Sequence, residues 1–278
     1  MAPGRMMLHP ATRDLDLDDP LTTAKRREII GKRKFLRQVY GEWYRRLVAA
    51  LPPGEGSVVE LGSGAGFLAE VVRGAITSEV LPVSRVRALM DGCALPFADG
   101  TLRAILMTNV LHHLPNVKSF LREADRSLRP GGVVATVEPW LTPWSRYVYT
   151  HWHHEPFDPE ARSWDLPPAH PLSSANGALP WIVFERDRAV FEAEFPSLRV
   201  RSIEPLMPFS YLISGGFSAL SIAPGWSFRF WRSVERAVRP LELGLAMFAV
   251  IVLERSSDAF GGRRWSPRAR AGSGKGTA

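Results

Sequence analysis

The sequence has 278 residues, of which 45% are hydrophobic and 23% are charged. This composition is typical of one large globular domain or two small ones, and it excludes a largely disordered chain. The single cysteine, Cys93, excludes a disulfide within the chain and is typical of a reducing compartment. The N-terminus has no signal-peptide pattern, and no apolar run reaches the length of about 20 residues needed to span a bilayer. We therefore expect a cytoplasmic protein.

The formal charge of +7 is typical of proteins that bind polyanions, but its distribution along the chain argues against that function. Residues 31–50 and 255–278 each contain six basic residues and one acidic residue, whereas residues 51–254 carry a net charge of −3. An acidic body does not provide the basic groove of a nucleic-acid enzyme. We therefore do not expect nucleic acid to be the partner of this protein. Because both ends of the chain are basic, nucleic-acid binding is kept as the alternative hypothesis.

The first half of the chain reads as alternating helices and strands. Residues 1–24 have no periodic pattern, and residues 25–50 are expected to form one helix because their apolar residues recur at helical spacing. Pro52-Pro53-Gly54 ends that helix. Residues 57–61 are then expected to form a short buried strand, followed by a glycine-rich turn and a helix over 67–73.

Two further strands are expected over residues 75–81 and 102–108. Asn116 is placed to cap a helix with one apolar face, and Arg129-Pro130-Gly131-Gly132 is expected to end it. Residues 133–137 are apolar except for Thr136 and predict a fully buried strand. Strands that alternate with helices predict a parallel sheet covered by helices on both faces.

The second half is less regular. Residues 139–197 are rich in proline, tryptophan and histidine and are expected to form an insertion. Two more strands are expected over 198–203 and 245–254, with a helix over 228–238 between them. Residues 256–278, rich in Arg, Gly and Ser, predict a disordered basic tail.

The sharpest chemical signal is the segment Glu60-Leu61-Gly62-Ser63-Gly64-Ala65-Gly66. A strand that enters a glycine-rich turn and opens a helix presents backbone N–H groups to a ligand. A flexible linker does not fit, because apolar secondary structure flanks both sides. A dinucleotide site, G-x-G-x-x-G, would place its third glycine one residue after Gly66. The carboxylate of Glu60 suits a cationic ligand, such as the ammonium of an amino acid, and would repel a pyrophosphate.

This segment resembles the E/D-x-G-x-G-x-G motif of the class I S-adenosylmethionine-dependent methyltransferases of the type 11-like group, and the resemblance extends over most of residues 57–138. It implies an α/β fold with a Rossmann-like, seven-stranded, mostly parallel sheet, helices on both faces and an antiparallel final strand. It also implies S-adenosylmethionine as cofactor and methyl transfer as activity. The implied domain spans residues 25–255, with a cap helix over 25–50, a core over 56–138 and the last strands over about 198–254.

The same resemblance implies which residues bind the cofactor. Glu79, 19 residues after Glu60, would hold the ribose hydroxyls. Asp91 would accept from the adenine amino group, with Cys93 packed nearby where the family usually has other residues. Asn109 would border the methionine part. Each of these residues also has a structural alternative to its role in cofactor binding. Glu79 could be an ordinary charged residue of a loop, Asp91 could cap a turn, and Asn109 could simply end a strand. The complete expected set is Glu60, Gly62, Gly64, Gly66, Glu79, Asp91, Cys93 and Asn109.

Two adjacent histidines are the expected catalytic residues. His112 and His113 follow the strand over 102–108, at the edge where ligands bind in open α/β sheets. One of them could act as general base toward a hydroxyl acceptor, whereas local packing is the alternative role. Transfer from a sulfonium can also proceed by proximity and orientation alone. The segment His151-Trp152-His153-His154-Glu155 lacks the spaced ligands of a zinc site, so no metal is predicted, and an acceptor-site role is expected.

Aromatic residues over 140–181 favour an apolar or ring-bearing acceptor, which would be a small molecule or a lipid- or glycan-linked group. Tyr40 and Tyr44 of the cap helix are expected to contact the cofactor. The basic face of that helix and the aromatic residues over 207–231 predict an acceptor with an anionic head or a peripheral contact with an anionic membrane. The alternative functions are a nucleic-acid methyltransferase and a non-catalytic binding protein of the same fold.

Overall fold

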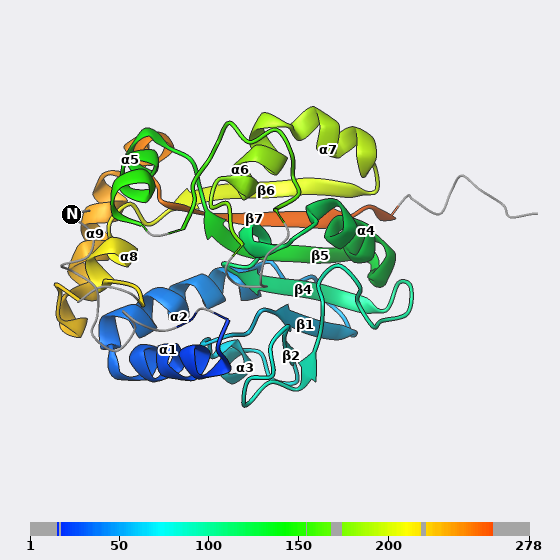
Figure 1. Ribbon diagram of the computed structural model, residues 1–278, viewed down its shortest axis with the longest axis horizontal. Helices are drawn as coiled ribbons and strands as arrows, with labels where there is room; N and C mark the ends of the chain where they lie inside the picture. Colours follow the sequence, from blue (N-terminus) through cyan, green and yellow to red (C-terminus); the bar gives the residue numbers. More distant parts are fainter. Residues whose placement is uncertain (1–15, 17, 154, 168–173, 218–220, 258–278) are drawn as a thin grey trace, which may run out of the picture.

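The computed structural model describes residues 16, 18–153, 155–167, 174–217 and 221–257. Most of the predicted basic tail, from residue 258 onward, lies outside the described residues. Within them, seven strands form one sheet in the order β3-β2-β1-β4-β5-β7-β6 (Figure 1). The strands are β1 (Ser57–Leu61), β2 (Ile76–Glu79), β3 (Ala88–Leu89), β4 (Leu102–Thr108), β5 (Leu128–Pro139), β6 (Leu198–Leu206) and β7 (Phe248–Arg255).

Strands β1 to β5 pair in parallel, whereas β7 runs antiparallel to both β5 and β6. The predicted Rossmann-like, mostly parallel, seven-stranded sheet is therefore confirmed. The strand order reverses direction between β1 and β4, since the chain moves outward to β3 and then returns to β4 beside β1. Such a reversal opens a crevice at the carboxyl ends of the strands, where ligands bind in open α/β sheets.

Two helices precede the sheet, because the predicted single helix breaks near its middle. The first, α1 (Pro20–Lys32), starts earlier than expected because the side chain of Asp19 caps it and a proline occupies its first position. The second is α2 (Lys34–Ala49). Between them Arg33 is extended, and its guanidinium donates to the carbonyl of Gly216 at 2.9 Å. The helix α2 packs on β5 and β7 of the sheet, whereas α1 packs against α2.

The two faces of the sheet bury separate apolar cores, because successive residues of a strand point to opposite faces. Ala104 and Leu106 of β4 pack in the core that includes α2. Ile105 and Met107 pack in the other core with α4 (Val117–Ser127). The predicted cap of α4 is confirmed, since the Asn116 side chain accepts from the backbone N–H of Ser119 at 2.6 Å.

Several element boundaries differ from the sequence predictions. The helix after the glycine turn is a single turn, α3 (Leu68–Val71), and not the longer element expected. Strand β5 begins at Leu128, five residues early, because Leu128 pairs with Leu102 of β4 and the Pro-Gly-Gly step forms an irregularity inside the strand. Strand β3 was not predicted, because two residues are too few to show a period.

The second half of the chain contributes short helices, some at the carboxyl end of the parallel strands and others, over residues 179–194, beside β6 (Figure 1). Within the described residues, none of the helices combines the length and apolar character needed to cross a membrane. The remaining helices are η2 (Leu111–His113), α5 (Pro143–Trp152), α6 (Leu179–Trp181), η3 (Ile182–Arg186), α7 (Arg188–Glu194), α8 (Ser210–Ser214), η4 (Gly225–Ser227), α9 (Phe228–Ala237), η5 (Arg239–Leu241) and α10 (Glu242–Leu245).

Candidate active site

The loop after β1 depends on glycine at three positions. Gly62 and Gly64 have φ values of +62° and +45°, which side chains rarely adopt. A Cβ at Gly62 would lie 2.4 Å from Cγ2 of Val110, so the loop can pack against the end of β4 only without a side chain. A Cβ at Gly66 would lie 2.3 Å from the hydroxyl of Tyr44. All three glycines line one cavity.

Glu60 is a buried carboxylate at the end of β1. Its side chain is 3% exposed, and Oε2 accepts from the hydroxyl of Ser63 at 2.7 Å. Burial raises the pKa of Glu60 to about 7, although the hydrogen bond from Ser63 opposes this shift. A buried acid with this pKa gains strongly from a cationic ligand, because the ligand replaces the lost solvation of the carboxylate.

Glu79 is a second buried acid, at the end of β2 next to β1. Its carboxylate accepts from the N–H of Val80 at 3.0 Å, and it lines the same cavity. Burial raises the pKa of Glu79, whereas the N–H groups of Val80 and Gly64 lower it. Adjacent parallel strands therefore bring Glu60 and Glu79 to the wall of the same cavity, next to the glycine loop.

The N-terminal helices close over the glycine loop. The hydroxyl of Tyr44 on α2 accepts from the N–H of Phe67 at 3.1 Å, and Nη2 of Arg27 on α1 donates to the carbonyl of Gly64 at 2.7 Å. Tyr40 and Tyr44 both line the cavity, where sequence analysis expected them. The contact of Arg27 was not predicted, because it depends on the break between the two helices.

The end of β4 carries two polar groups that the described residues do not satisfy. Thr108 Oγ1 and Asn109 Oδ1 are buried, and among the described residues neither atom has a hydrogen-bond partner. Asn109 also has a φ of +57°, an uncommon conformation that is often found at functional sites. Both residues line the cavity, so these groups are available to a polar ligand.

A buried pair joins the end of β5 to the turn after β4. Nδ1 of His112 lies 2.6 Å from Oε2 of Glu138, whose side chain has no exposed surface. The N–H groups of Val110 and Leu111 donate to Oε1 of the same carboxylate, at 3.0 and 2.9 Å. Burial lowers the pKa of His112, but Glu138 and Glu155 raise it by more, to about 9. Glu138 was not among the residues predicted from the sequence, although an acid at the end of a mostly apolar strand was a usable signal.

His113 and Glu155 complete this part of the cavity. Oε2 of Glu155 lies 3.6 Å from Nε2 of His112, and Oε1 lies 3.9 Å from Nε2 of His113. Nδ1 of His113 lies 3.0 Å from the carbonyl oxygen of Ser174. Burial, followed by the charge of His112, lowers the pKa of His113 to about 4. The histidines expected to be catalytic are thus adjacent in space, and they face an acid from the insertion.

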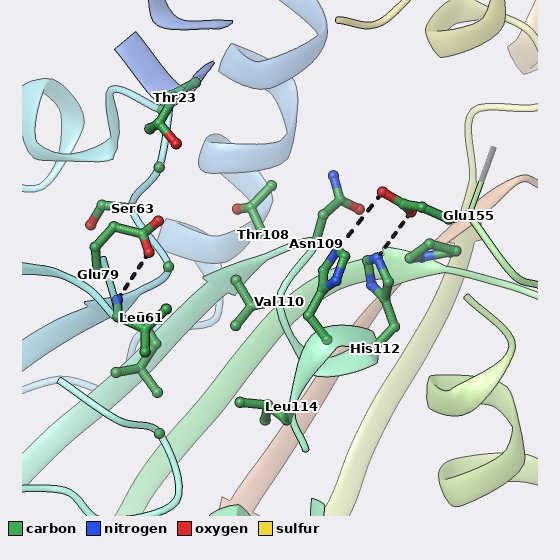
Figure 2. Close-up of a pocket in the computed structure, with 18 of the residues that line it drawn as sticks. Thr23, Leu61, Ser63, Glu79, Thr108, Asn109, Val110, His112, Leu114 and Glu155 are labelled. Carbon is green, nitrogen blue, oxygen red and sulfur yellow. Dashed lines mark hydrogen bonds and ion pairs between the residues drawn. The ribbon is translucent and has the colours of Figure 1, made fainter. Parts of the chain in front are cut away.

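One cavity of about 410 Å³ connects the glycine loop and its two acids with the end of β4, the two histidines and Glu155, and its volume is within the usual size range of ligand pockets. Glu138 does not line this cavity. Figure 2 shows Ser63 and Glu79 at one end, His112 and Glu155 at the other, and Asn109 between them. The aromatic residues Tyr40, Tyr149, Tyr211, Phe217 and Phe248 also line it.

The remaining predicted residues lie at the exposed edge of the cavity or outside its wall. Asp91 is exposed, lines the cavity and accepts from the N–H of Cys93 at 2.8 Å. The thiol of Cys93 is directed to the carbonyl of Asn116 at 3.4 Å and is not part of the cavity wall. Burial raises the pKa of this thiol to about 11. Of the histidine cluster from the insertion, His153 and Glu155 line the cavity, His151 is exposed and residue 154 lies outside the described residues.

Comparisons with known proteins agree with this geometry. Residues 59–136, which contain β1 to most of β5, match the methyltransferase domain family. This part of the chain carries a methyltransferase domain. An uncharacterized methyltransferase from Mycobacterium sp. (strain JLS) is 35% identical over 108 residues, which cover 33% of this chain and 42% of that protein. The ubiquinone/menaquinone biosynthesis C-methyltransferase UbiE of Desulfotalea psychrophila is 31% identical over 109 residues, covering 32% of this chain and 44% of that protein.

The matched part spans less than half the length of these curated relatives. One solved structure shares the fold over a larger part of the chain. It is a chain of the complex between the Haloferax volcanii Trm112 methyltransferase activator and a methyltransferase. The TM-score is 0.51 at 14% identity, and the alignment covers 87% of this chain and 98% of that chain. The likeness in fold therefore extends well beyond the matched family region.

Proposed function

We propose that this protein transfers a methyl group from S-adenosylmethionine to a small-molecule or a lipid- or glycan-linked acceptor. The observation that carries the proposal is the single cavity, which joins a glycine loop with two buried acids to an aromatic end with two histidines. A cationic, polyhydroxylated cofactor and an acceptor could therefore meet inside one partly enclosed space. Such an arrangement favours an in-line displacement, because it fixes the two reactants in orientation.

The residues at the glycine end fit this cofactor. The carboxylate of Glu60 would balance its positive charge, and Glu79 could accept from two vicinal ribose hydroxyls at once. The unsatisfied oxygens of Thr108 and Asn109 would accept from the amino-acid part. Asp91, at the exposed rim, would take the adenine amino group. The cofactor would supply an activated methyl group, and these residues would bind and orient it.

The opposite end would receive the acceptor. Tyr149, Tyr211 and Phe248 are aromatic walls that suit an apolar or ring-bearing body. His112 and His113 would position the acceptor atom near the methyl group. The pKa of His112, about 9, favours its charged form near neutral pH, so we assign it orientation by hydrogen bonding. His113, whose pKa is lowered to about 4, stays neutral and can accept a proton from a hydroxyl.

Cofactor affinity is expected to depend on pH through Glu60. The carboxylate is ionised above its pKa of about 7 and neutral below it, and only the ionised form attracts a cation. The dissociation constant of S-adenosylmethionine should therefore rise about tenfold between about pH 8 and pH 6, as measured by calorimetry. Glu60→Gln should bind weakly and lose this dependence, whereas Glu55→Gln, an exposed acid before β1, should behave like the wild type.

Two outcomes would contradict the proposed function. The first is the absence of saturable S-adenosylmethionine binding to the wild-type chain. The second is binding without transfer of labelled methyl groups to any acceptor in a broad small-molecule and lipid screen, which would instead favour the non-catalytic alternative. Retention of nucleic acid, with labelled methyl groups incorporated into it, would favour the nucleic-acid alternative.

We also propose that the protein contacts an anionic membrane surface through the end of the molecule that carries α9. Trp226 and Phe230 are 83% and 62% exposed there. A neighbouring groove between α2 and α9 is lined mainly by basic side chains, and one acid, Glu42, lines it as well. Exposed aromatic rings beside guanidinium groups suit the interface of anionic lipids. The basic residues of the groove are Lys34, Arg37, Arg45, Arg229, Arg232 and Arg236.

Co-sedimentation with vesicles tests this surface. We expect the wild type to sediment with phosphatidylglycerol-rich vesicles and not with pure phosphatidylcholine vesicles. The double variant Trp226→Ser/Phe230→Ser should lose most of this binding, because it removes the inserted apolar groups. Val190→Ser, on α7 away from α9 (Figure 1), removes an exposed apolar residue as a matched control and should bind normally. Equal binding by all three proteins, or none by the wild type, would contradict the proposal.

A further inference from the structure

Three ligand atoms converge at the acceptor end of the cavity. They belong to His112, His113 and Glu155, and all lie within 4.8 Å of one another. The distances from Glu155 to the two Nε2 atoms, 3.6 and 3.9 Å, are too long for good hydrogen bonds. Atoms that bind one divalent ion at about 2.0–2.2 Å lie roughly 3–3.5 Å apart, so a small contraction would close this set around an ion. Figure 2 shows Glu155 directed at His112.

Both histidines are held in the way that metal-binding histidines are held. Nδ1 of His112 is engaged by the Glu138 carboxylate, and Nδ1 of His113 lies 3.0 Å from the Ser174 carbonyl oxygen. An acceptor at Nδ1 fixes the tautomer in which Nε2 carries the lone pair. Both Nε2 atoms are on the side of Glu155. The surrounding groups therefore orient two nitrogen donors and one carboxylate toward a common point.

The charge of the cluster also suits a dication. Glu138 is fully buried and Glu155 is 21% exposed, so their two negative charges lie largely outside water. A metal ion bound at both Nε2 atoms would displace the proton of His112, so both imidazoles would be neutral in the bound state. One divalent ion would then balance the two carboxylates, and Nδ1 of His153 also lies near this cluster, 3.9 Å from Oε2 of Glu155.

We propose that His112, His113 and Glu155 bind a divalent transition-metal ion, with Glu138 and the Ser174 carbonyl orienting the two histidines. Two imidazoles and one carboxylate favour an ion of the zinc or iron(II) class over magnesium or calcium, which prefer oxygen ligands. Three protein ligands leave a coordination position for water or an acceptor oxygen. If the proposed methyl transfer is correct, the ion would orient and acidify an acceptor hydroxyl inside the cavity, and this role would replace the proton-accepting role given above to the metal-free His113.

This site differs from the one considered in the sequence. In the sequence, the segment from His151 to Glu155 lacks the spacing of a zinc site, and no metal was predicted there. The structure uses only Glu155 of that run and adds two histidines from the turn after β4, some 42 residues earlier. His151 is exposed, and its Nδ1 lies 2.8 Å from the carbonyl of Tyr147.

Metal titration of the full chain tests the site without any methyl-transfer assay. After treatment with a chelator, we expect the wild type to bind one Zn²⁺ per chain by calorimetry and to give a visible absorption band with Co²⁺. His113→Gln and Glu155→Gln each remove a proposed ligand and should weaken Zn²⁺ binding by more than about tenfold. A loss of about tenfold is already seen when a residue that only hydrogen-bonds to a metal ligand is replaced. His151→Gln, which alters a nearby exposed histidine, should bind like the wild type.

The outcomes separate this inference from the proposed function. Absence of stoichiometric Zn²⁺ binding, or unchanged binding in folded His113→Gln and Glu155→Gln variants, would overturn the metal site. A loss of similar size in His151→Gln would also overturn it, because the ion would then bind the exposed histidines. Circular dichroism verifies folding of each variant. S-adenosylmethionine binding is measured in parallel, so failure of the cofactor site and failure of the metal site give different results.

Discussion

Glu138→Ala is expected to lower the free energy of unfolding by about 3–5 kcal/mol, the range for removing one partner of a buried ionic network. The carboxylate is fully buried and accepts from the N–H groups of Val110 and Leu111, from the hydroxyl of Thr136 and from His112. Removing it leaves these donors without a partner in a site closed to water. Urea unfolding followed by circular dichroism measures the change.

Two further variants make this test specific. Glu204→Ala removes an exposed carboxylate that pairs with Arg46 on the surface, and it should cost less than about 1 kcal/mol. Glu138→Gln keeps an oxygen that can accept from the two backbone N–H groups, so its stability should fall between those of the wild type and Glu138→Ala. A change below about 1 kcal/mol in Glu138→Ala would show that the pair does not stabilise the fold.

Gly64→Val is expected to abolish cofactor binding while the protein stays folded. The φ of +45° is strained for any side chain and most strained for a β-branched one. A Cβ at this position would also lie 3.3 Å from Oε1 of Glu79, in the space where the ligand must approach. We expect the dissociation constant of S-adenosylmethionine to rise at least about a hundredfold, or about 2.7 kcal/mol, by calorimetry.

Gly74→Val provides the matched control. Gly74 has a φ of +82°, no atom lies within 4 Å of a Cβ built there, and it is not part of the cavity wall. This variant carries the same kind of backbone strain, so it should lose similar stability and bind the cofactor normally. Wild-type affinity in Gly64→Val, or an equal loss in Gly74→Val, would show that the glycine loop does not form the binding site.

The glycine end of the cavity could be predicted from residues that are close together in the sequence. Gly62, Gly64 and Glu60 are neighbours in sequence, and a strand–turn–helix places neighbours together whatever the rest of the fold does. Glu79 and Asn109 could be placed almost as well, because adjacent parallel strands end at the same edge of a sheet. The N-cap at Asn116 was equally predictable, since its effect depends on residues three positions away.

The break at Arg33 illustrates the opposite case. Apolar residues recur at helical spacing from Phe35 onward, and Gly31 is only a weak local signal against a single helix over residues 25–50. The extended residue is stabilised by a distant carbonyl, that of Gly216, and it allows Arg27 to reach Gly64. A pattern of period 3.6 records which residues are apolar, but it does not record a contact made 183 residues away.

By itself, the sequence determined the alternation of strands and helices, the glycine loop and the acids at the ends of β1 and β2, because these depend on period, spacing and turn chemistry. Only the tertiary structure decided the other end of the cavity. There His112, Glu138 and Glu155 come from three separate segments, and burial together with mutual charge sets their properties. Interactions of that kind act through space in a medium of low polarity, so they depend on distances that no local pattern encodes.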